Sequence, residues 1–151
     1  MSAHHLLDAA TEAFFSGDFH LAKTMYELLL DQGEKADQRN LVAHSKQHLG
    51  MIARLHGEDD VAERYINEAL ALLEALDDKV ALAGALDTLV LMEADYFKRL
   101  AYHERSLGLK EQLGDVPSQV LSLQALGDLA MEAGDVAAAE SYRQRATELQ
   151  D

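Results

Sequence analysis

The stretch that decides the fold covers residues 126–146 and reads LGDLAMEAGDVAAAESYRQRA. An apolar run with helical spacing stops at Gly134, and Asp135 opens a second run. Glycine accepts the left-handed conformation in which helices commonly end, and aspartate caps the free N–H groups of the next helix. Small residues recur on both sides of this turn, at Gly127, Ala139 and Ala146. The stretch therefore predicts two helices that are joined by a tight turn and packed closely through small side chains.

The same hairpin pattern recurs along the chain. Its members have counterparts exactly 77 residues earlier, at Leu49, Gly50, Gly57, Ala62 and Ala69. A shift of 40 residues back from Leu49 gives a first copy, and a shift of 37 residues forward gives a third. We therefore predict one domain, 1–151, that contains eight helices in four repeats, at about 3–33, 37–76, 79–113 and 116–149.

Composition supports an all-α fold and limits the classes of partner. Of 151 residues 48% are apolar, one is proline and none is cysteine, while helix-forming residues dominate. The net charge of −14 argues against binding to nucleic acid and against adsorption to anionic membranes, because both require basic surfaces. An apolar or basic protein or peptide is the expected partner.

Motifs of catalysis and of targeting are missing from the sequence. There is no nucleophile elbow, no phosphate-binding glycine loop and no cysteine chemistry, so we expect no enzyme activity and no cofactor. The N-terminal residues lack the basic and apolar regions of a secretory signal, and no apolar run approaches the length of a spanning helix. We therefore expect a cytoplasmic protein.

The repeated small residues resemble the tetratricopeptide repeat (TPR), over roughly Ala3 to Leu149. The segment 95–107, DYFKRLAYHERSL, is similar to the second helix of that family. Repeats longer than 34 residues resemble the variety found in kinesin light chains and in bacterial regulators. The resemblance implies a right-handed α-solenoid. Ala94 and Arg99 depart from the pattern and are expected to loosen the third repeat, whereas Arg143 and Thr147 give the last repeat a polar outer face, as a terminal cap requires.

The resemblance also implies a concave groove that is lined by the first helix of every repeat and accepts a peptide. Histidine, glutamine, methionine and apolar side chains make this expected lining more apolar than ionic. The residues that we assign to the groove are His4, Leu7, Thr11, Phe15, His44, Gln47, Met51, Arg54, Thr88, Leu91, Gln124 and Asp128.

The histidines of this lining raise the question of a metal site. His44 and His48 are four residues apart on one helix, a spacing that can hold zinc. No HExxH motif, cysteine or nearby carboxylate accompanies them, so we expect polar positions of a groove wall and no metal.

The predicted function is that of a protein-interaction scaffold or adaptor that binds a peptide or protein segment in the groove. Two alternatives stay open at this point. The groove could sense a signalling peptide for a regulator, or an apolar cluster around Met92, Tyr96 and Phe97 could drive formation of a homodimer.

Overall fold

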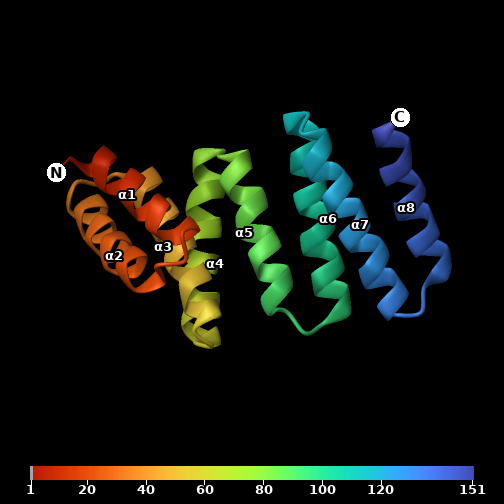
Figure 1. The fold of residues 1–151 in the computed structure, drawn as a ribbon, viewed down its shortest axis with the longest axis horizontal. Helices are drawn as coiled ribbons and strands as arrows, with labels where there is room; N and C mark the ends of the chain where they lie inside the picture. The colour runs from red at the N-terminus through yellow and green to blue at the C-terminus, as the bar shows by residue number, and fades with distance from the viewer. Residues whose placement is uncertain (1) are drawn as a thin grey trace. The chain divides into compact units, whose positions relative to one another are not determined.

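The computed structural model describes residues 2–151, and these residues form eight α-helices and no strand. The helices are α1 (Ala3–Phe15), α2 (Phe19–Lys35), α3 (Arg39–Leu55), α4 (Asp59–Leu76), α5 (Lys79–Met92), α6 (Tyr96–Leu113), α7 (Val116–Glu132) and α8 (Val136–Gln150). Each successive pair forms a helical hairpin, and Figure 1 shows α5 with α6 and α7 with α8 joined by turns at one end. The four hairpins fall close to the four predicted repeats.

The chain divides into two compact units. The first unit extends to Asp77 and holds α1–α4, and the second unit, Asp78–Asp151, holds α5–α8. Within each unit every helix packs against the helices that precede and follow it in sequence. Each unit is therefore two hairpins held by helix-to-helix packing, and the grouping of all four hairpins into one domain stays a prediction.

Turns of the predicted type join the helices of the first and last hairpins. Gly17 and Gly134 have φ values of 87° and 80°, which favour glycine because it has no Cβ. Asp18 then accepts a hydrogen bond from the Leu21 N–H at 3.2 Å, and Asp135 accepts one from the Ala138 N–H at 3.1 Å. These aspartates satisfy donors that the first helical turn leaves open, which is why each new helix begins there.

The first predicted repeat, 3–33, implies a helix that ends at Gly33, and this prediction is wrong. The helix continues to Lys35, and the positive φ of 51° falls on Asp37. A Cβ at Gly33 would lie 3.0 Å from Val42 Cγ2 and 3.3 Å from the Val42 nitrogen. The glycine is needed because α3 begins against this point of α2, and a side chain would hold the two helices apart.

The small residues of the 77-residue pattern lie in the interior of both units. Ala62 and Ala69 of α4 and Ala139 and Ala146 of α8 are buried. Gly50 lies so close to α4 that a Cβ there would be 2.6 Å from Ile66 Cδ1. Their role in bringing paired helices together is thus the predicted one.

Candidate binding site

In the first unit the predicted groove residues are dispersed among exposed and buried environments. His4 is exposed, with its ring 3.5 Å from the Asp8 carboxylate, and Phe15 is exposed as well. Leu7 packs against the buried core, and the Thr11 hydroxyl donates to the Leu7 carbonyl at 2.8 Å. Three further predicted residues on α3 are half-buried, namely His44, Met51 and Arg54.

Two predicted groove residues are buried, which corrects their assignment to an open surface. The relative solvent exposure is 7% for Gln47 and 6% for Thr88. The Thr88 hydroxyl donates to the Gly84 carbonyl of its own helix at 3.0 Å. Both lie on helix flanks that pack inside the fold, and a single sequence does not separate such a flank from a neighbouring open face.

The other predicted residues of the second unit remain accessible. Leu91 is exposed at the end of α5, and Gln124 and Asp128 are exposed on α7. Gln124 and Asp128 line one shallow hollow of about 400 Å³ beside α8, where the Arg143 guanidinium lies 3.5 Å from the Asp128 carboxylate. That any of the twelve residues binds a partner stays a prediction.

The His48 ring packs against aromatic rings of α1 and α2. Its ring stacks on the buried Tyr26 ring of α2 at 4.6 Å and 13°, and meets the Phe14 ring edge-on at 5.3 Å. Burial lowers the pKa of His48 below its ordinary value, against a smaller opposite effect of its 2.8 Å hydrogen bond with the His44 carbonyl oxygen. Within residues 2–151 no group of three or more His, Asp or Glu side chains is arranged to hold a metal ion.

Residues of the two units that are 77 positions apart can be compared directly. This comparison reveals a polar cluster, which the groove predicted from the sequence did not include. At four positions the first unit carries apolar residues or glycine and the second unit carries polar ones. Ala10, Tyr26, Leu29 and Gly33 of the first unit correspond to Asp87, His103, Ser106 and Lys110 of the second. We call Asp87 of α5, Ser106 and Lys110 of α6, and Ser122 of α7 the polar cluster.

A continuous set of hydrogen bonds links the polar cluster. The Ser106 hydroxyl donates to Asp87 Oδ1 at 2.7 Å, and the Lys110 ammonium donates to Asp87 Oδ2 at 2.9 Å. The same ammonium donates to the Ser122 hydroxyl oxygen at 2.6 Å, so it connects α5, α6 and α7. The two helices of the third hairpin are therefore joined by charge-assisted hydrogen bonds, and the loosening expected from Ala94 and Arg99 stays a prediction.

His103 borders this cluster in a partly buried environment. Burial lowers the pKa of His103 below its ordinary value; the nearby Asp87 carboxylate opposes this change, and Lys110 and Arg99 reinforce it. The His103 Nδ1 atom is buried and has no hydrogen-bond partner. An imidazole with a lowered pKa thus lies next to a carboxylate in a partly buried environment.

A cavity of about 280 Å³ opens over the polar cluster. It is lined by side chains from α5, α6 and α7, namely Asp87, His103, Lys110, Ser118, Leu121, Ser122 and Ala125. The Lys110 side chain is 13% exposed, whereas the Asp87 side chain is 39% exposed. The carboxylate is therefore the charged group that the cavity presents most openly.

The equivalent place in the first unit is filled by the protein itself. Ala125 corresponds to His48, and His103 corresponds to Tyr26. In the first unit the imidazole of His48 lies flat against the Tyr26 ring. In the second unit the filling ring is replaced by the methyl group of Ala125, and the cavity lies next to His103.

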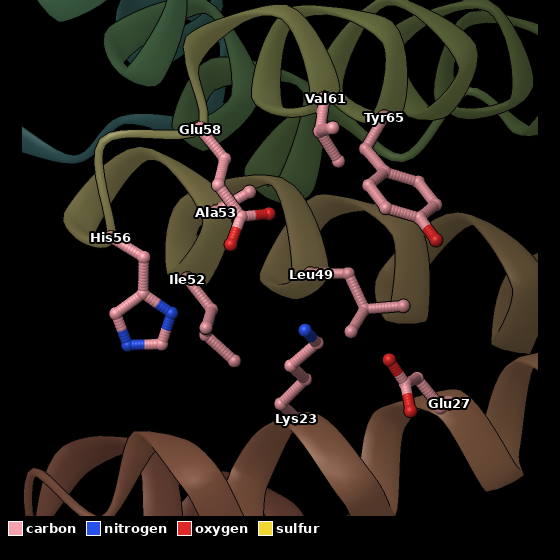
Figure 2. A pocket seen from close by; sticks show the side chains of 9 residues that line it. All are labelled: Lys23, Glu27, Leu49, Ile52, Ala53, His56, Glu58, Val61 and Tyr65. Carbon is pink, nitrogen blue, oxygen red and sulfur yellow. The ribbon is translucent and has the colours of Figure 1, made fainter.

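A second, more enclosed cavity of about 100 Å³ lies in the first unit among α2, α3 and α4 (Figure 2). Leu49, Ile52 and Ala53 of α3 form its apolar floor, and Lys23 reaches toward it from α2. Charged and aromatic side chains border it, namely Glu27, His56, Glu58 and Tyr65.

The second unit carries different side chains at the positions that correspond to this second cavity. Lys23 corresponds to Leu100, which packs with Tyr142 against the buried core of its unit. The Tyr142 hydroxyl donates to Glu104 Oε1 at 2.9 Å, and Glu104 corresponds to Glu27. Burial and this hydrogen bond raise the pKa of Tyr142 to about 12. At the cavity of Figure 2 the first unit thus carries a lysine where the second unit carries a partly buried leucine.

Comparison with known proteins concerns the fold. No protein-family model and no curated protein sequence matches the chain. Across the described residues, the helices are too short or too polar to span a bilayer. The chain is similar to the crystal structure of BtubC (BKLC) from P. vanneervenii, a kinesin light chain-like TPR protein, with a TM-score of 0.83 and 25% identity. This match covers 94% of the chain, which spans only 60% of BtubC.

A second solved structure, that of MamA protein, is 20% identical over 98% of this chain and 91% of its own, with a TM-score of only 0.37. The likeness to BtubC agrees with the eight helices and four hairpins, and it confirms the predicted all-α, TPR-like fold class. The chain is a TPR-like helical repeat protein, of an architecture that generally serves as a scaffold for protein interaction.

Proposed function

We propose that the protein binds a segment of a partner protein on the face formed by α5 and α7 in the second unit. The observation that carries this proposal is an exposed apolar side chain in the wall of the cavity over the polar cluster. Leu121 of α7 is 66% exposed and lines the cavity, and Leu91 of α5, which does not line it, is 63% exposed. Exposed apolar side chains beside a partly polar cavity are typical of a binding surface.

The partner segment is basic as well as apolar. The chain carries a net charge of −14, and the most accessible charged group of the cavity is the Asp87 carboxylate. Opposite charge on the partner increases the rate of encounter and penalises acidic competitors. Because scaffolds of this fold are generally non-enzymatic, we propose binding without catalysis, in the cytoplasm.

Selection of peptides from a random display library tests the proposal. Peptides that combine apolar and basic residues should be enriched, and their affinity should fall at least tenfold in Leu121→Glu. Val136→Glu is the matched control, because Val136 is also exposed but lies at the start of α8, away from the cavity. Selected peptides that bind Leu121→Glu and Val136→Glu equally well would contradict the proposal, as would self-association that buries Phe97 instead.

A further inference from the structure

We propose that the cavity over the polar cluster binds the guanidinium group of an arginine side chain. This inference rests on the proposed function, because it names the group of the partner segment that the second unit recognises.

The shape of the cavity points to a planar guest. The first unit shows what the corresponding space holds when the chain fills it, namely a flat imidazole stacked on an aromatic ring. In the second unit His103 takes the position of Tyr26, and no second ring lies at the position of His48, where Ala125 stands. A guanidinium group is planar and stacks readily on flat rings, whereas an alkylammonium group is a compact point charge.

The charge of the cavity points to a cationic guest. Each oxygen of Asp87 already accepts one hydrogen bond, from Ser106 or from Lys110. A carboxylate has about four acceptor sites, so each oxygen can accept a further N–H. The half-exposed carboxylate can therefore receive donors from the cavity side, and guanidinium supplies several in one plane.

The remaining walls suit the aliphatic part of an arginine. Leu121 and Ala125 offer apolar surface along α7, over which the methylene groups can lie. Lys110 is the unfavourable neighbour, because its ammonium repels the guest from across Asp87. That ammonium is largely buried and already bonded to Asp87 and Ser122, so it is a poor site for an anion.

The test is an NMR titration of the ¹⁵N-labelled full chain with N-acetylarginine methylamide. N-acetyllysine methylamide and the uncharged N-acetylcitrulline methylamide are the comparison probes. We expect saturable shifts of amides at positions 84–87 and 121–125, with arginine at least tenfold tighter than citrulline and tighter than lysine. Equal binding of arginine and citrulline would overturn the inference.

Variants assign the interaction to individual groups. Asp87→Asn should remove arginine binding, whereas Asp128→Asn should not, although Asp128 is another exposed aspartate of this unit. Lys110→Met should tighten arginine binding severalfold, because it removes the repelling charge. If Asp87→Asn alone unfolds, the double variant Asp87→Asn with Lys110→Met removes both charges together and should fold without binding.

The outcomes separate this inference from the proposed function. Binding of acetate at the same amides, lost in Lys110→Met, would identify an anion site and overturn the inference. If display-selected peptides shift amides of α5 and α7 but arginine does not, the proposed function holds and the inference fails. If neither the peptides nor arginine shifts these amides, both fail.

Discussion

Replacement of Gly50 by alanine should destabilise the protein, although alanine is the better helix former. A Cβ at Gly50 would lie 2.6 Å from Ile66 Cδ1, 2.7 Å from Ile66 Cγ1 and 3.3 Å from the Ala62 carbonyl oxygen. Ile66 is fully buried, so its side chain has no free volume into which to move. Overpacking of this kind costs about 1–3 kcal/mol, against a helix-propensity gain of about 0.5–1 kcal/mol. We expect a net loss of about 1–2 kcal/mol.

Gly127, 77 residues later, supplies the matched control. A Cβ there would lie 3.2 Å from Arg143 Cγ, and Arg143 is an exposed, flexible side chain that can shift. Gly127→Ala should therefore be neutral or stabilising by up to about 1 kcal/mol, because the propensity gain remains. Urea unfolding followed by far-UV circular dichroism measures both variants against the parent protein.

The shortest of these contacts can be removed in a third variant. Ile66→Val removes the Cδ1 atom and alone costs about 0.5–1.5 kcal/mol. In combination with Gly50→Ala it should cost clearly less than the sum of the two single changes. Equal effects of Gly50→Ala and Gly127→Ala, or strict additivity with Ile66→Val, would refute the packing argument.

Further predictions follow from the differences between the two units. Lys23→Leu should raise the free energy of unfolding by about 1 kcal/mol in urea titrations, because leucine fills this position in the second unit as Leu100; an unchanged or lowered stability would show that the cavity is not fillable. Since burial lowers the pKa of His48 below 6.5, the unfolded chain binds the proton first, and stability falls as pH drops below about 6.5. His48→Phe should reduce that fall in thermal melts between pH 7.5 and 5.5, and an identical pH dependence would contradict the assignment. The buried Ser45 hydroxyl has no hydrogen-bond partner, so Ser45→Ala should raise the free energy of unfolding by about 1 kcal/mol. Its counterpart Ser122→Ala removes an acceptor from the Lys110 ammonium and should lower the free energy of unfolding by about 1–3 kcal/mol. Changes of the same sign in the two variants would argue against this difference.

The sequence was sufficient to predict the helices and the hairpin turns because their determinants are local. Each Gly-Asp pair, at 17–18 and at 134–135, acts on backbone groups within four residues of itself. The aspartates of both pairs accept the capping hydrogen bonds that the sequence predicts. Gly33 was misinterpreted because glycine serves two purposes that look identical in a sequence. It can take a positive φ, or it can allow close approach, and only the position of Val42 in space distinguishes them.

The candidate site was harder to predict because its residues come from three helices. Asp87 and Ser106 each stand where other repeats carry small or apolar residues. Each residue on its own therefore looks like a random departure from the repeat pattern. Their hydrogen bond shows that the two substitutions belong together, with Lys110 as the third member. The signal was present in the 77-residue register, which pairs these polar residues with Ala10, Leu29 and Gly33.

The most direct test of the account is a map of amide shifts in the ¹⁵N-labelled full chain during titration with a display-selected peptide. The account predicts saturable shifts on α5 and α7, centred on Asp87, Leu121 and Ala125, that weaken in Leu121→Glu. Shifts confined to the cavity of Figure 2, at Leu49, Ile52 and their neighbours, would contradict it.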